Sequence, residues 1–260
     1  MGLGHDLGLV FQDSKTVCST TQIKFLGLKL DSIAMEAHLP SNKLVFLKLL
    51  LQEWSIKCVA CLLEVQELVG FLQFVSQVIP CSCSFLHHII NFSMKFCSPF
   101  QKLHVGRGVK ADIHWWHTFC VLWNGVCFLM PSLLSAEVYT DASERKGIGG
   151  VYQSHWFSSC VPCRYCDRDI QFKEAFVILH AILCWGDAWA GHHVSFYCNN
   201  QAVVHWLTLG TCHSAHSMPI VQLISMMAAC PNFSFSCIWI SSEDNALADA
   251  TSRFQFTKLF

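Results

Sequence analysis

The segment between Asp187 and Glu243 contains no Asp, Glu, Lys or Arg, and this lack of charge constrains the fold more than any other feature. A stretch this apolar is either buried in a core or inserted in a bilayer. Pro219, Pro231, the pair Asn199-Asn200 and several His interrupt it, so no run of about 20 apolar residues exists. We therefore expect buried strands and helices here, and no membrane span.

The composition of the whole chain excludes several classes of protein. Hydrophobic residues make up 53% and charged residues only 13% of the 260 residues, against a usual charged share of about 25%, which excludes a disordered chain. The net charge of −1 gives no overall cationic surplus, so any binding of nucleic acid must come from local patches. The 16 cysteines occur without a secretory signal pattern, which favours a reducing, intracellular setting (nucleus or cytoplasm) over secretion.

The second half of the chain alternates between strand and helix patterns. We expect strands at 137–141, 147–153, 155–159, 194–198 and 233–240, and helices at 171–189, 201–209, 220–229 and 245–252. This order predicts an α/β or α+β domain over residues 132–260.

The first half has a different pattern. Short strands are expected at 8–11 and 22–30, followed by helices at 43–54, 62–78, 85–96 and 110–122 and a connector at 123–131. We therefore expect a strand-rich region at 1–40 and a helical region at 41–131, ahead of the 132–260 domain.

Four polar residues stand at the ends of predicted elements in the second half: Asp141, Glu174, Asn199 and Asp249. Strand ends and helix starts at a common sheet edge can gather such side chains, although each residue alone also fits a turn, a helix N-terminal charge or a cap. Clustered carboxylates repel one another unless divalent cations neutralise them. Two Mg²⁺ (or Mn²⁺) ions held about 3.5–4 Å apart by oxygen ligands are suited to phosphodiester hydrolysis.

The motifs around these residues resemble the RNase H domain of retrotransposon polymerases, and DIRS-type (gypsy-like) elements most. The matching segments are Thr140-Asp141-Ala142-Ser143, Lys173-Glu174, Cys198 to Val204, and Asp244-Asn245 to Arg253-Phe254. The resemblance implies a mixed five-stranded RNase H-like sheet with flanking helices. It also implies metal ligands at Asp141, Glu174 and Asp249, and two-metal hydrolysis of the RNA strand of RNA–DNA hybrids.

The first half resembles reverse transcriptases of the same elements. The similar segments are Phe25-Leu26-Gly27-Leu28, Met35-Glu36-Ala37, Leu39-Pro40, Leu63 to Gly70 and Phe85-Leu86. By this resemblance, residues 1–40 correspond to the end of a polymerase palm and residues 41–131 to a mostly helical thumb and connection. The paired polymerase aspartates of the family would lie upstream of Met1, so we expect no polymerisation by this chain.

One departure from the family pattern concerns the proposed metal site. The family has an acidic metal ligand where Asn199 stands, so the site loses a charge and a bridging ligand. Because even outer partners of metal sites are worth about 10–100-fold in affinity or activity, we expect weak or absent hydrolysis. A degenerate RNase H enzyme and a catalytically dead nucleic-acid-binding remnant are both compatible with the sequence.

Nucleic-acid contacts would come from scattered cations. Lys43, Lys48 and Lys57 lie on the thumb-like helices, and Lys102, Arg107 and Lys110 flank the connection-like region, where the resembled enzymes hold the hybrid. A solvated helix face explains such lysines equally well. We expect low, strongly salt-dependent affinity.

A small zinc-binding interaction protein is the alternative from another class. Cys58 and Cys61 form one Cys-x-x-Cys pair, and Cys160, Cys163 and Cys166 with His155 could supply four ligands. Arginine is scarce in this chain, at positions 107, 145, 164, 168 and 253, whereas Cys, His and Trp are abundant. We interpret this skew as mutational decay of an arginine-rich coding sequence, which favours scattered cysteines over a built zinc site.

Overall fold

The computed structural model describes residues 17–79, 82–122, 126–128, 134–212, 214, 216–231 and 233–258. The expected strand at 8–11 and most of the expected connector at 123–131 lie outside these residues.

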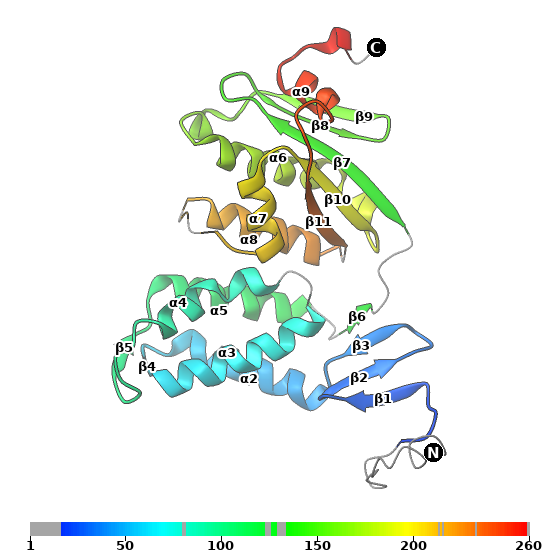
Figure 1. The fold of residues 1–260 in the computed structure, drawn as a ribbon. Helices are drawn as coiled ribbons and strands as arrows, with labels where there is room; N and C mark the ends of the chain where they lie inside the picture. Colours follow the sequence, from blue (N-terminus) through cyan, green and yellow to red (C-terminus); the bar gives the residue numbers. More distant parts are fainter. Residues whose placement is uncertain are drawn as a thin grey trace, which may run out of the picture.

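A five-stranded mixed sheet forms the centre of the C-terminal part (Figure 1). Its strands, in the order β11-β10-β7-β8-β9, are β11 (Ser234–Trp239), β10 (His193–Cys198), β7 (Ser135–Ala142), β8 (Ile148–Tyr152) and β9 (His155–Ser159). Strand β10 runs parallel to both β7 and β11, whereas β7, β8 and β9 are joined by antiparallel pairing. The mixed five-stranded sheet with flanking helices confirms the predicted fold class.

Helices cover both faces of this sheet. Along β8, Tyr152 contacts the rings of Trp185 and Trp189 near the end of helix α6 (Ile170–Trp185). Gly149 instead lies against Thr251 in helix α9 (Ala246–Ser252). Since alternate residues of a strand point to opposite faces, α6 and α9 pack on opposite sides of the sheet.

The remaining helices of this part are α7 (Gln201–Leu209) and α8 (Met218–Ala229). Asn200 caps α7, because its Oδ1 accepts hydrogen bonds from the backbone N–H groups of Ala202 and Val203. The predicted helix at 171–189 is a 16-residue α-helix followed by a short 3-10 turn, Gly186–Trp189.

The N-terminal part begins with a four-stranded antiparallel sheet. Its order is β1-β2-β3-β6, and its strands are β1 (Gln22–Phe25), β2 (Leu28–Asp31), β3 (Glu36–His38) and β6 (Val126–Phe128). The expected single strand at 22–30 is wrong: the chain turns at Leu26-Gly27 and forms a hairpin. Gly27 has φ of +85°, a backbone conformation that glycine adopts without steric cost.

Four helices follow in the N-terminal part, together with one small two-stranded sheet. The helices are α2 (Ser41–Ile56), α3 (Leu62–Val75), α4 (His87–Ser93) and α5 (Arg107–Leu122), and β4 (Val59–Cys61) pairs with β5 (Lys102–His104). Leu47, Trp54, Leu68 and Trp116 are fully buried among them. The expected helix at 85–96 is shorter, because Phe85 belongs to a preceding 3-10 turn and stacks on Trp115.

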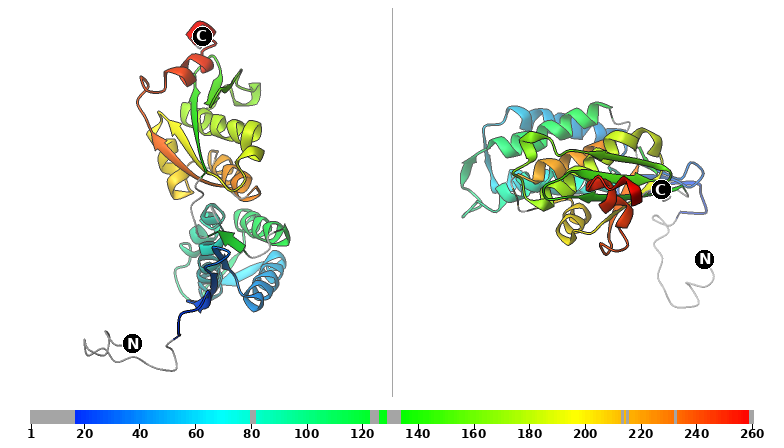
Figure 2. Two further views of the ribbon diagram at one scale, coloured as in Figure 1. Left: turned by 90° about the vertical axis from the view of Figure 1, so that its right-hand side faces the viewer. Right: turned by 90° about the horizontal axis from the view of Figure 1, so that it is seen from above.

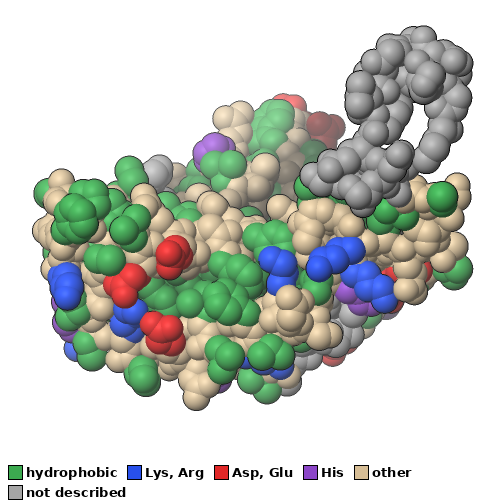
Figure 3. Space-filling model, turned by 90° about the horizontal axis from the view of Figure 1, so that it is seen from below, with side chains coloured by type: hydrophobic (Ala, Val, Ile, Leu, Met, Phe, Trp, Pro, Cys, Tyr) green, Lys and Arg blue, Asp and Glu red, His purple; other side chains and the backbone are tan. Residues whose placement is uncertain are grey.

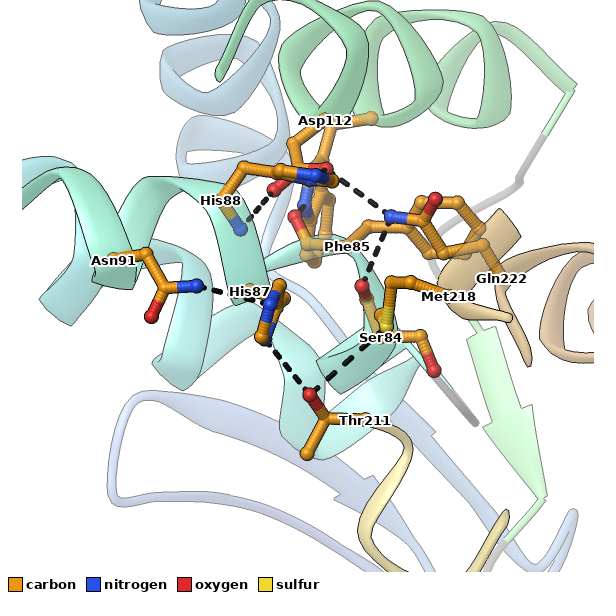
Figure 4. A network of polar contacts seen from close by, with 10 residues as sticks. Ser84, Phe85, His87, His88, Asn91, Asp112, Thr211, Met218 and Gln222 are labelled. Atoms are coloured by element: carbon orange, nitrogen blue, oxygen red, sulfur yellow. Dashed lines mark hydrogen bonds and ion pairs between the residues drawn. The ribbon is translucent and has the colours of Figure 1, made fainter. Parts of the chain in front are cut away.

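Two apolar cores result, whose buried residues lie between 28 and 120 and between 136 and 237, and α8 contributes partly buried residues to both. Figure 2 shows the two parts end to end along the long axis of the molecule. Polar contacts join them. The hydroxyls of Ser84 and Ser225 lie 2.8 Å apart. Thr211 Oγ1 lies 2.8 Å from His87 Nδ1, as Figure 4 shows. The assignment of the first 131 residues to palm, thumb and connection stays a prediction.

Apolar side chains also reach the surface. On α2, Val45, Phe46 and Leu49 are more than half exposed, and Figure 3 shows apolar side chains spread over this end of the molecule. No helix among the described residues is both long enough and apolar enough to cross a bilayer.

Candidate functional site

Asp141 and Asn199 lie side by side at one edge of the C-terminal sheet. Strands β7 and β10 are parallel, with Tyr139 opposite Tyr197, so the positions two residues further along also face each other. Asn199 Nδ2 donates a hydrogen bond to Asp141 Oδ1 over 3.1 Å. The carboxyl ends of two parallel strands therefore bring these two predicted residues together.

Glu174 reaches the same edge from α6. The helix begins after Asp169, whose carboxylate accepts a hydrogen bond from Phe172 N over 2.7 Å, and this cap places Glu174 one turn into the helix. Glu174 is buried. Burial raises the pKa of Glu174 well above its ordinary value and the charge of Asp141 adds to the shift, whereas the Ala142 N–H and the Cys198 thiol oppose it. The net shift is toward the neutral form of this carboxyl.

Asp249 is tied to the cluster by Ser252, the last residue of α9, and by Arg253, which follows the helix. Ser252 Oγ lies 2.5 Å from Asp141 Oδ2 and 2.9 Å from the backbone oxygen of Asp249. Arg253 Nε donates to Asp249 Oδ1 over 2.6 Å, an ion pair within one turn of helix. The carboxylate of Asp249 is thus paired with a guanidinium.

A pocket of about 500 Å³ opens at this edge. Asp141, Glu174 and Asn199 line it, whereas Asp249 does not. Burial raises the pKa of Asp141, and the charge of Asp249 raises it further, while the hydroxyl of Ser252 and the guanidinium of Arg253 lower it. The structure therefore brings three of the four predicted site residues into one pocket, with the fourth beside it.

Cations in the same pocket were not predicted as site residues. Arg145 and Lys146 lie in the turn after β7, and Arg253 follows α9. The sequence holds a signal for them, since Glu144-Arg145-Lys146 follows Asp141 closely and Ser252-Arg253 follows Asp249. The pocket consequently combines acidic groups on its floor with basic groups around them.

The side chains at this site are of the type that binds Mg²⁺, but their arrangement does not suit a magnesium site. Carboxylate oxygens are the ligands that Mg²⁺ prefers. Here Asn199 offers its amide nitrogen to Asp141, the Ser252 hydroxyl lies on the other Asp141 oxygen, and Arg253 pairs with Asp249. Among the residues that the structure describes, no group of three or more His, Cys, Asp or Glu is placed to hold a metal ion. The residues as arranged do not fit two-metal binding.

Two of the six cations predicted to bind nucleic acid make hydrogen bonds or ion pairs within the protein instead. Lys110 Nζ donates to three backbone carbonyls at the end of α2, those of Trp54, Ser55 and Lys57, over 2.6–3.0 Å. The ammonium of Lys57 pairs with Glu53 and Glu64, each at 2.9 Å. These contacts stabilise helix ends and leave neither ammonium free for a phosphate.

The other four cations lie nearer to solvent. Lys43 Nζ lies over the Phe74 ring, 4.4 Å from its centroid. Lys48, Lys102 and Arg107 are exposed, on α2, on β5 and at the start of α5 respectively. Arg107 lines a second pocket of about 570 Å³ together with Lys95.

The predicted zinc ligands do not form a site. Cys160, Cys163 and Cys166 are exposed free thiols, and the thiol of Cys166 donates to the backbone oxygens of Val161 and Pro162. Cys58 and Cys61 are also free thiols. Within the described part of the chain, neither these cysteines nor His155 belong to a group of three or more His, Cys, Asp or Glu that could hold a metal ion.

Comparisons with known proteins find no matching family model and no matching curated protein. Solved structures with similar folds include RNase H1 of the halophilic archaeon Halobacterium salinarum, 15% identical with a TM-score of 0.37, covering 45% of this chain and 93% of that one. LC11-RNase H1, isolated from compost by a metagenomic approach, is 18% identical with a TM-score of 0.38, covering 48% of this chain and 99% of that one. The foamy viral protease-reverse transcriptase in complex with double-stranded DNA is 13% identical with a TM-score of 0.36, covering 86% of this chain and 46% of that one. At such identities the likeness concerns the fold alone.

Proposed function

We propose that this chain is a reverse transcriptase/RNase H fragment of a retroelement polymerase, in which the RNase H-like centre hydrolyses the RNA strand of RNA–DNA hybrids weakly or not at all. The proposed weakness of hydrolysis rests on one observation. The Asn199 amide nitrogen donates to Asp141 at the place where the resembled family has an acidic metal ligand. The amide nitrogen that faces Asp141 cannot coordinate a cation, and the amide oxygen of Asn199 is neutral and brings no charge to a metal site.

The test is cleavage of a labelled RNA–DNA hybrid by the full chain in Mg²⁺ or Mn²⁺. We expect little or no cleavage by the wild-type chain and a gain of at least about tenfold in Asn199→Asp, since a lost ligand partner costs about 10–100-fold. Asn200→Asp is the matched control, because it adds the same charge one residue away. Its side-chain oxygen can still cap α7.

A second readout does not depend on turnover. A ligand that binds only the folded state raises stability in proportion to RT ln(1 + [L]/Kd), so Mg²⁺ should raise the Tm of Asn199→Asp and leave those of the wild type and Asn200→Asp unchanged. Efficient cleavage by the wild-type chain, or an Mg²⁺-dependent Tm in the wild type, would contradict the proposed impairment.

Binding without cleavage is the second candidate function. The observation that favours it is the set of cations around the pocket, Arg145, Lys146 and Arg253, with the exposed Lys48 and Arg107 elsewhere. Contacts to phosphates through a few cations predict weak affinity that falls steeply with salt. Hybrid affinity measured at several salt concentrations tests this, and an affinity independent of salt would contradict it.

A further inference from the structure

A pocket of about 600 Å³ lies at the other end of β7, away from Asp141. Its walls come from β7, from the end of β8, and from the first turn of α9 with the segment that leads into it. None of its lining residues lines the pocket around Asp141. Its volume is within the range of about 300–1,000 Å³ typical of small-molecule sites.

The polar groups of this pocket are rich in hydrogen-bond acceptors. Glu137 and Asp244 contribute carboxylates, and none of the ten lining residues is Lys or Arg. Glu137 Oε1 accepts a long hydrogen bond of 3.4 Å from the hydroxyl of Tyr197, and Asp244 Oδ2 accepts one from Ser241 Oγ. Neither carboxylate forms an ion pair with a Lys, Arg or His among the described residues. A positively charged ligand would complement them.

Asn245 provides an independent indication of a missing donor. This lining residue is 1% exposed, and its Nδ2 donates to the backbone oxygen of Thr140 over 2.9 Å. That bond fixes the amide orientation, because a flipped amide would set its oxygen against the Thr140 oxygen. Within the described part of the chain, Asn245 Oδ1 has no hydrogen-bond partner. Buried acceptors without donors are unfavourable, so this oxygen points to a donor supplied from outside the protein.

The remaining walls suit the body of such a ligand. Tyr139 lines the pocket and stacks on Tyr197, with ring centroids 4.6 Å apart and planes inclined by 13°. Val151 and Leu247 add apolar surface. A planar guanidinium can stack on an aromatic face and donate several hydrogen bonds in a fixed geometry, and an alkyl chain attached to it would contact the apolar wall.

We propose that this pocket binds an alkyl guanidinium, either as a free small molecule or as an arginine side chain of a partner peptide. Glu137 and Asn245 Oδ1 accept hydrogen bonds from the guanidinium, Tyr139 contacts its plane, and Val151 and Leu247 contact the alkyl chain. The site goes beyond the proposed function, because it shares no residue with the Asp141 pocket and needs neither metal nor hydrolysis.

Saturation-transfer NMR on the full chain tests the proposal with matched probes. Butylguanidinium and N-acetyl-arginine amide carry the charge, and butylurea and N-acetyl-citrulline amide have the same shapes without it. A tripeptide with a central arginine between alanines represents the partner peptide. We expect the charged probes to bind at least about tenfold more tightly than their neutral counterparts.

Substitutions locate the binding. Glu137→Gln should weaken the charged probes by about tenfold, and Gln153→Arg should block them by placing a guanidinium in the pocket. Glu243→Gln, which removes the same charge from an exposed residue outside the lining, should change nothing. Circular dichroism checks that each variant is folded.

The outcomes separate the possible sources of the ligand. Tighter binding of the tripeptide than of butylguanidinium supports a partner's arginine, and equal binding supports a free guanidinium. Equal binding of charged and neutral probes would overturn the proposal, as would an equal loss in Glu137→Gln and Glu243→Gln, or unchanged binding in Gln153→Arg.

Discussion

Asp112→Asn tests the contact between the two parts of the chain. The Asp112 carboxylate is fully buried on α5 and accepts three hydrogen bonds. Two come from His88, from its backbone N at 2.9 Å and its Nδ1 at 2.8 Å, and the third comes from Gln222 Nε2 at 3.2 Å (Figure 4). Because Gln222 belongs to α8 and also donates to Ser84 O, one carboxylate links both cores.

The size of the expected loss of stability follows from these three hydrogen bonds. Asparagine keeps one carbonyl oxygen and turns an N–H group toward donors, so one or two of the three bonds are lost. Hydrogen bonds to charged groups contribute about 1.5–3 kcal/mol each, and the 38% exposure of the His88 side chain reduces its share by solvent screening. We expect the free energy of unfolding to fall by about 2–4 kcal/mol. At about 2–4 °C per kcal/mol for a chain of this size, the Tm falls by about 4–16 °C.

The effect should also depend on pH. The hydrogen bond to Asp112 raises the pKa of His88 in the folded state, and burial opposes the shift only in part. A raised folded-state pKa gives stability that is fully present below the unfolded value of about 6.5 and is lost as the pH rises through the folded value. The difference between wild type and Asp112→Asn should therefore be larger at about pH 5.5 than at about pH 8.5.

Thermal unfolding of the full chain, followed by circular dichroism at both pH values, measures both effects. Asp187→Asn is the control, since Asp187 is exposed. If Asp112→Asn is as stable as this control, the carboxylate does not hold the two parts together. If the difference is the same at both pH values, the charge of His88 is not involved.

Two further predictions concern single contacts, and each is measured by denaturant unfolding. Lys110→Met should destabilise the chain by about 2–3 kcal/mol, because three carbonyls at the end of α2 lose a charged donor, whereas Lys102→Met on the exposed β5 should change stability little. Gly149→Ala should destabilise by at least about 3 kcal/mol, because a Cβ would overlap Thr251 and push α9 off the sheet. Gly70→Ala, at an exposed position of α3 with open space around it, should instead stabilise by about 0.5–1 kcal/mol. A stable Lys110→Met or Gly149→Ala variant would show that the corresponding contact does not contribute.

The order of elements in the C-terminal part could be predicted because its strand and helix periods are distinct. The pairing of Asp141 with Asn199 was also accessible, since residues at the ends of neighbouring parallel strands meet at one edge. The hairpin at Gly27 was missed because two short alternating runs, 22–25 and 28–30, resemble one strand. The phase of the alternation changes at Phe25-Leu26, and this change together with the glycine indicates the break.

Tertiary partners could not be predicted from local patterns. Lys110 has the spacing of a solvated helix residue, yet its ammonium reaches carbonyls more than fifty positions earlier in the chain. Helical spacing contains no information about these contacts. Asp249 and Arg253, by contrast, are four residues apart, a spacing that favours an ion pair on a helix and could have indicated this contact.

The carboxyl cluster is compensated by contacts within the chain. Two carboxylates forced together in a buried site repel each other, and each such group either shifts its pKa or finds a partner. Here each of the three carboxyl groups is compensated within the chain. The pKa of Glu174 is shifted toward the neutral form, and Asp141 accepts hydrogen bonds from Asn199 and Ser252. Asp249 forms an ion pair with Arg253. Compared with a carboxylate at position 199, Asn199 brings one charge fewer and one donor more, and both differences reduce the need for a metal. Under the proposed function, we therefore expect the residue that weakens hydrolysis to make the folded state independent of divalent ions as well.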